Sequence, residues 1–317
     1  MPPLISRLRA PTMFGIGVSN LYHNMKLPFI DPQAEDAPLI IFLHIAKTAG
    51  MSLNAMLFRQ FQQKILAGSV PGATQSRSGM YRLPEVATFY ASHSADRKKE
   101  FQACIGHNFF GLHKLIDRQC SYVSLIRDPI DRCISTYNYL LQTELIPRST
   151  SFEEFVELEL VICNSFQTRQ ICGSTSLDLT ADFDPGTLMT KSSVTENRPV
   201  EMFDYIVARH NIQRHFLLCA PSERFDEVTL VLARIFGWAP KDVVQPKINV
   251  TDRTIQRNEI PAKLLTHLQH QNRYDEKLYR FVTARFDKLV KSLGVEFQHD
   301  LERLREHSAE SSKQTSG

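Results

Sequence analysis

The chain has 317 residues, of which 43% are hydrophobic and 22% are charged. That is enough to bury one large α/β core, or a core with a smaller appendage. Lysine and arginine number 37 against 34 aspartate and glutamate, a net charge of +3. This near balance excludes the polybasic composition of a nucleic-acid-binding protein, so no nucleic-acid partner is predicted.

The spacing of the cysteines and the hydropathy of the chain bear on the cellular compartment in which the protein is expected. The six cysteines show no CxxC pair or other close metal-ligand spacing, and some, such as Cys219, lie in apolar runs where a free thiol behaves as a small hydrophobe. No metal site is predicted. No apolar run reaches the roughly 18 residues of a membrane span, and Pro11 interrupts the basic and apolar start of the chain. These features predict a reduced, cytoplasmic protein with neither signal peptide nor transmembrane segment.

The first elements of the chain already contain a candidate anion site. Residues 1–37 hold five prolines and no sustained periodicity, which predicts an irregular N-terminal arm laid over the domain. The apolar run 39–43 suits a strand covered on both faces, as in a parallel sheet. A polar turn over 44–50 and a helix over 52–66 follow it. Strand, small-residue turn with Lys47, and helix together can cradle a phosphate; an ordinary strand-to-helix turn with a surface lysine is the alternative.

Strands and helices alternate along the rest of the chain. Strands are predicted at 101–107, 121–126 and 216–220, helices at 130–142, 151–171, 200–214, 223–236, 260–271 and 274–293, and loops at 67–80 and 245–260. Asp128 is a natural N-cap and Pro129 a natural first helical residue. The alternation predicts an α/β protein, a P-loop-like three-layer fold with a central parallel sheet flanked by helices. We expect a single domain over 38–300 and a disordered tail over 301–317.

Polar side chains gather where the predicted strands end. His44 and Lys47 follow the first strand, His107 ends the second, and Arg127 follows the third. In open α/β sheets the ligand crevice lies outside the carboxyl ends of the strands. These residues are therefore expected to line one shared crevice.

The turn after the first strand is not a Walker P-loop, because Lys47 and Thr48 precede Gly50 instead of following a second glycine. It resembles the 5′-phosphosulfate-binding loop of the carbohydrate-type sulfotransferases, H-[IV]-P-K-[TC]-[GA]-[GT]-[TS]-S. Two positions depart from that pattern: Ala46 replaces the usual proline, and Met51 a frequent hydroxyl residue. The resemblance implies donor binding by this loop, through His44, Ala46, Lys47, Thr48, Ala49, Gly50, Met51 and Ser52.

The segment 122–137 resembles the 3′-phosphate-binding segment of the same family, [LF]-R-[DE]-P-x-[DE]-R-x-x-S-x-[YF]. The resemblance implies that Arg127, at a strand end, and Ser135, two turns into the helix, hold the 3′-phosphate; a guanidinium with a hydroxyl suits that group. A structural role is expected for Arg132, paired with Asp128 or Asp131. The alternative for this segment is a plain helix cap with a surface arginine.

Weaker likenesses extend the match to about residues 39–290. Residues 104–112 resemble the G-H-x-x-[FY]-G strand end at which the family places its catalytic base, here His107. Its rivals are His44, which more simply braces the loop, and His113. Residues 164–170 resemble an N-x-x-T-R segment that lines the site, and residues 216–238 a strand–helix unit of the family. Arg169, Asn108 and His113 are candidate acceptor-binding residues; for Arg169 an ion pair with Glu154 or Glu157 is the alternative.

The resemblance implies a sulfotransferase that uses 3′-phosphoadenosine 5′-phosphosulfate and releases adenosine 3′,5′-bisphosphate. Sulfuryl transfer is an in-line displacement in which a base, His107, takes the acceptor proton and a cation, Lys47, neutralises charge on the leaving phosphate. No metal is needed. The expected acceptor is a carbohydrate or a small hydroxylated molecule. The alternatives are a P-loop kinase, which would need Mg²⁺ held by an acidic strand end, and a non-catalytic nucleotide- or glycan-binding relative.

Overall fold

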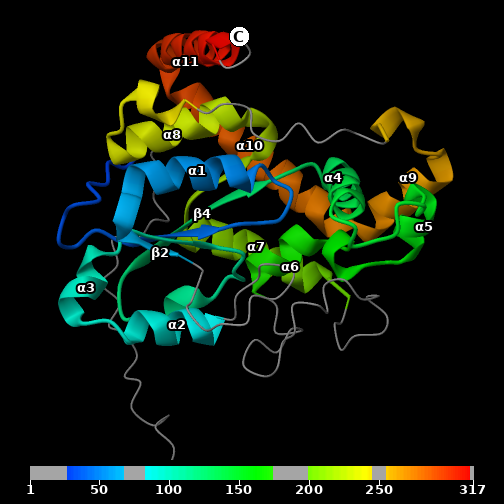
Figure 1. The fold of residues 1–317 in the computed structure, drawn as a ribbon, viewed down its shortest axis with the longest axis horizontal. Coiled ribbons are helices and arrows are strands. Elements are labelled where there is room, and N and C mark those ends of the chain that lie inside the picture. Colours follow the sequence, from blue (N-terminus) through cyan, green and yellow to red (C-terminus); the bar gives the residue numbers. More distant parts are fainter. Residues whose placement is uncertain (1–26, 68–82, 174–198, 245–254, 315–317) are drawn as a thin grey trace, which may run out of the picture.

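The computed structural model describes residues 27–67, 83–173, 199–244 and 255–314 (Figure 1). Most of the predicted N-terminal arm, nearly all of the loop expected at 67–80, and much of the one expected at 245–260 lie outside these residues. None of the described helices is long and apolar enough to cross a membrane.

Five parallel strands form the described sheet, in the order β2-β3-β1-β4-β5. They are β1 (Leu39–Leu43), β2 (Ile65–Ala67), β3 (Ala103–Gly106), β4 (Cys120–Ile126) and β5 (Phe216–Pro221). All five residues of β1 are buried, as its uninterrupted apolar sequence requires of a strand with both faces covered. The predicted α/β fold with a central parallel sheet is confirmed.

Helices cover both faces of the sheet and make three layers (Figure 1). Alternate residues of β1 point to opposite faces. Ile40 and Phe42 share a core with α1 (Gly50–Phe61), α8 (Phe225–Phe236) and α11 (Gly294–Gln314). Leu39, Ile41 and Leu43 share the other core with α2 (Leu83–Ala91) and α7 (Met202–His215). A third core joins α4 (Pro129–Gln142), α5 (Phe152–Glu157) and α9 (Ala262–Gln271).

Several elements differ from the sequence-based expectation. The helix predicted over 151–171 is broken into α5, a 3₁₀ turn and α6 (Phe166–Cys172), because the backbone takes positive φ values at Glu159 (48°) and at Ser165 (45°). Residues 65 and 66, predicted as the end of a helix, and residue 67, predicted as the start of a loop, form edge strand β2 instead. Neither α2 nor α3 (Ala95–Glu100) was predicted.

The two ends of the described chain lie on the α8 side of the sheet. Of the expected arm, residues 27–37 contain no helix or strand, and the Ile30 N–H donates to the Ile235 carbonyl of α8 at 2.8 Å. Residues 301–314, predicted to be part of a disordered tail, form the second half of α11, so that prediction is wrong as far as Gln314. Phe297, Leu301 and Leu304 recur at helical spacing and are at most 4% exposed.

α10 (Arg273–Ser292) is a helix of 20 residues. It packs against β5, α7 and α6, and it also contacts α4.

Candidate functional site

Strand register brings two histidines into contact at the carboxyl ends of β1 and β3. Leu43 pairs with Gly106, so the residues that follow, His44 and His107, lie side by side. Their rings are stacked, with centroids 4.0 Å apart and an interplanar angle of 24°. The shared edge expected from the sequence therefore exists, and β1 with its neighbours β3 and β4 supplies it.

Hydrogen bonding selects the tautomer of His107. Its Nδ1 lies 2.9 Å from the His44 carbonyl oxygen. A carbonyl only accepts, so Nδ1 carries the proton and Nε2 keeps a free lone pair. Burial lowers the pKa of His107, and the bond to the His44 carbonyl offsets part of that shift. His107 is thus a neutral imidazole with a basic nitrogen available.

His44 is the internal support of the turn. It is 6% exposed and its ring also stacks on Phe42 at 5.4 Å. Burial lowers its pKa well below the usual value, and the neighbouring His107 and Lys47 act in the same direction. A Cβ on Gly50 would come within 2.0 Å of the His44 ring, so the imidazole occupies the space that a side chain at 50 would need.

The turn presents unpaired backbone donors. Lys47 and Ala49 adopt left-handed conformations, with φ of 68° and 58°, which are costly for residues with a Cβ. Within the described residues, the N–H groups of Lys47, Ala49 and Gly50 form no hydrogen bond. α1 has no side-chain N-cap and no acidic residue in its first turn. Free N–H groups at an uncapped helix start favour an anion.

Of the other loop residues, one supports the turn and the rest are partly or largely exposed. The Thr48 hydroxyl donates to the Ile45 carbonyl at 2.9 Å and is fully buried, so it braces the turn. Met51, in the place of a frequent hydroxyl residue, is 61% exposed. Ala46 and Ser52 are half-buried.

Two cations lie against this turn. The Arg127 guanidinium donates through Nη1 to the Lys47 carbonyl at 3.2 Å. Lys47 Nζ lies 4.4 Å from the centre of the Tyr139 ring, and Tyr139 is one turn beyond Ser135 on α4. Burial lowers the pKa of Lys47, and Arg127 lowers it further. The structure thus joins the two segments that the sequence analysis connected.

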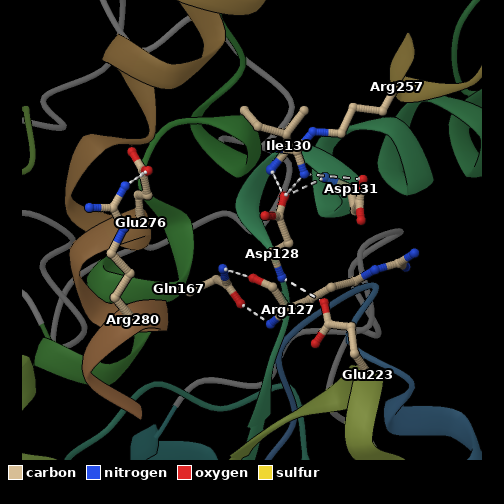
Figure 2. Close-up of polar contacts among 9 residues, drawn as sticks. All are labelled: Arg127, Asp128, Ile130, Asp131, Gln167, Glu223, Arg257, Glu276 and Arg280. Carbon is tan, nitrogen blue, oxygen red and sulfur yellow. Dashed lines mark hydrogen bonds and ion pairs between the residues drawn. The ribbon is translucent and has the colours of Figure 1, made fainter. Parts of the chain in front are cut away.

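The start of α4 is held by polar contacts on every side (Figure 2). The Asp128 carboxylate accepts from the Ile130 and Asp131 N–H groups and pairs with Arg257 at 3.0 Å. The Glu223 carboxylate accepts from the Asp128 N–H at 2.8 Å. Because Asp128 is engaged as a helix cap, it is not the free acidic strand end that a P-loop kinase needs for Mg²⁺.

The expected pairing of Arg132 with Asp128 or Asp131 is wrong. Arg132 is fully buried and donates to the Ile162 carbonyl at 2.6 Å. Its structural role remains, with a different partner. Among the described residues no group of three or more His, Cys, Asp or Glu side chains is arranged to hold a metal ion.

The candidate acceptor residues separate in space. His113 Nδ1 lies 2.9 Å from the Tyr122 hydroxyl and its ring is next to that of His215, so it belongs to the α7 side of β4 and not to the His44–His107 pair. Arg169 is 1% exposed. Asn108 is fully buried beside His107, and within the described residues its side-chain amide has no hydrogen-bond partner.

Sequence reasoning missed three residues of this region. Tyr139 was detectable, because it lies four residues after Ser135 and shares its helix face. Gln167 and Gln170, on α6, hydrogen-bond to backbone groups at the strand ends. Such side-chain-to-backbone contacts leave no pattern in a sequence.

Comparison with known proteins identifies the family. Residues 17–314 match the model of the Galactose-3-O-sulfotransferase family. The chain belongs to the galactose-3-O-sulfotransferase family. It is 23% identical to the bovine and human galactose-3-O-sulfotransferase 3, over 93% of this chain and 73% of each relative. It is 24% identical to the pig galactose-3-O-sulfotransferase 2, over 71% of this chain and 55% of that protein.

Membership confirms the resemblance to carbohydrate sulfotransferases and makes the protein a sulfotransferase, with 3′-phosphoadenosine 5′-phosphosulfate as the donor of its family. The predicted cytoplasmic location is wrong, since the galactose-3-O-sulfotransferases are Golgi-resident type II membrane enzymes. None of the six cysteines, all of which lie in the described residues, forms a disulfide there, and five of them are buried. A buried thiol behaves as a small hydrophobe in any compartment, which is why cysteine usage misled the prediction.

Proposed function

We propose that this galactose-3-O-sulfotransferase family member transfers the sulfuryl group of 3′-phosphoadenosine 5′-phosphosulfate to the 3-hydroxyl of a galactose residue in a carbohydrate acceptor. The acceptor follows from the names of the relatives. One observation carries the site: within the described residues the N–H groups of Lys47, Ala49 and Gly50 form no hydrogen bond, while Arg127 donates to the Lys47 carbonyl and His107 to the His44 carbonyl of the same turn.

Each residue has a distinct role in the proposed reaction. His107 Nε2 accepts the proton of the galactose hydroxyl as its oxygen forms a bond to sulfur. The bond between sulfur and the leaving phosphate oxygen breaks at the same centre, and the Lys47 ammonium neutralises the charge on that oxygen. The free N–H groups of the turn bind the 5′-phosphate, while Arg127 and Ser135 bind the 3′-phosphate.

Ligand preference distinguishes the proposed sulfotransferase from a nucleotide kinase. Calorimetric titration of the protein with adenosine 3′,5′-bisphosphate and with ADP should show much tighter binding of the bisphosphate, because the proposal assigns Arg127 to a 3′-phosphate that ADP lacks. Stronger binding of ADP would count against the donor assignment.

The acceptor and the base are tested with radiolabelled donor. A β-galactoside should be sulfated and its 3-O-methyl ether should not. His107→Gln should lower kcat by about 10²- to 10⁴-fold, the range for a lost general base, while bisphosphate binding is retained. Equal labelling of the ether would refute the position of transfer, and wild-type turnover by the variant would refute the base.

A further inference from the structure

The helix α6 is unusual because polar side chains fill its buried surface. All seven of its residues are buried, and Gln167, Thr168, Arg169 and Gln170 are four of them. Burying a polar side chain is unfavourable unless it is hydrogen-bonded. The partners of these side chains therefore indicate what the helix does.

Gln167 holds the main chain of Arg127. Its Nε2 donates to the Arg127 carbonyl at 2.9 Å, and its Oε1 accepts from the Arg127 N–H, also at 2.9 Å (Figure 2). One amide thus pairs with both backbone groups of the first residue after β4. The direction in which the Arg127 side chain leaves the strand is fixed by this pair.

Gln170 holds the surroundings of His107. Its Nε2 donates to the His44 carbonyl at 3.0 Å and to the Asn108 carbonyl at 2.7 Å. The His44 carbonyl is also the acceptor of the His107 Nδ1 proton. Gln170 therefore fixes the group that sets the tautomer of His107 and, through Asn108, the main chain directly after it.

α6 is itself anchored from outside the site. The Asp275 carboxylate of α10 accepts from the N–H groups of Gln167 and Thr168, at 3.1 and 2.7 Å. At the other end the Asn211 amide donates to the Ile171 carbonyl at 3.0 Å. The two glutamines thus extend from a helix that is hydrogen-bonded to both α10 and α7.

We propose that Gln167 and Gln170 are positioning residues with separate tasks: Gln167 orients Arg127 for the donor, and Gln170 orients His107 for the acceptor proton. This inference rests on the proposed function. Its distinctive consequence is a division of effects between two side chains one helical turn apart, which a general loss of α6 would not produce.

Gln167→Met and Gln170→Met test this division, because methionine has a similar length and cannot make the hydrogen bonds. Gln167→Met should weaken binding of adenosine 3′,5′-bisphosphate by about tenfold and leave kcat at saturating donor within about threefold of wild type. Gln170→Met should lower kcat by about tenfold to a hundredfold with bisphosphate affinity unchanged, since a displacement of about 1 Å costs that much.

Gln271→Met is the matched control. Gln271 is also buried, at 8% exposed, but its amide contacts only His267, on α9, among the described residues. The control should leave both quantities unchanged. Thermal unfolding of each variant identifies any that fail to fold; Gln167→Glu and Gln170→Glu, which keep the side-chain shape, then replace them and should show the same division.

Three results would overturn the inference: both variants changing affinity and kcat together, neither variant changing either, or Gln271→Met matching them. Failure of the wild-type protein to bind the bisphosphate would instead refute the proposed function, and this inference with it.

Discussion

Replacing Gly50 by alanine should disturb the site through His44. The glycine is not needed for its backbone conformation, because its φ is not among the positive values of the chain. It is needed for space: the added Cβ would lie 2.0 Å from His44 Cδ2 and Nε2, whereas ordinary contact begins near 3.4 Å. The imidazole must therefore move by about 1.4 Å.

That movement has no easy direction. The His44 ring is stacked between Phe42 and His107, with centroids at 5.4 and 4.0 Å. Overpacking of this kind costs about 1–3 kcal/mol of stability. Since His107 both stacks on this ring and donates to the His44 carbonyl, we also expect kcat to fall by about 10²-fold for a displacement of about 1 Å.

A double-mutant cycle measures the clash directly. Urea unfolding and turnover are recorded for Gly50→Ala, His44→Ala and the double variant. Without the imidazole the new methyl group has room, so Gly50→Ala should cost less than about 0.5 kcal/mol in the His44→Ala background, a coupling of about 1–3 kcal/mol. If Gly50→Ala costs the same in both backgrounds, or leaves stability and turnover at wild-type values, the steric reasoning is wrong.

Three further predictions concern neighbouring groups. Tyr139→Leu should lower kcat/KM by about two- to fivefold, the value of a lost cation–π contact with Lys47, while Tyr139→Phe should not; equal effects would point to the hydroxyl instead. Because burial lowers the pKa of His107 below 6.5, the acid limb of kcat/KM should have its midpoint below pH 6.5; a midpoint above about pH 7 would contradict a neutral base. Asp275→Asn removes the charge that accepts two α6 N–H groups and should lower the unfolding free energy by about 2–4 kcal/mol in urea denaturation; a loss under about 1 kcal/mol would show that α6 is anchored elsewhere.

Short sequence patterns determined much of the fold and the outline of the site. The run 39–43, the turn before Gly50, and the Asp128-Pro129 cap are each recognisable within a dozen residues, because strand burial, turn composition and helix capping are short-range effects. They were enough to predict a parallel α/β fold, and the resemblance of residues 44–52 and 122–137 to known motifs implied the carbohydrate sulfotransferase family. The same local reasoning failed where packing decides: it missed the break at Ser165 and the docking of the last helix.

Only the tertiary structure decided how the site is assembled. The contact between His44 and His107 depends on the register of β1 against β3, which no short pattern reports. His107 contacts the His44 carbonyl of the turn, whereas His113 contacts the Tyr122 hydroxyl, and this separation of the two histidines also depends on how the elements pack. Gln167 lies 40 positions from Arg127 in the sequence, and Gln170 lies 126 positions from His44, yet each contacts the main chain of its partner. Interactions over such separations are set by how whole elements pack, so they become visible only in the folded chain.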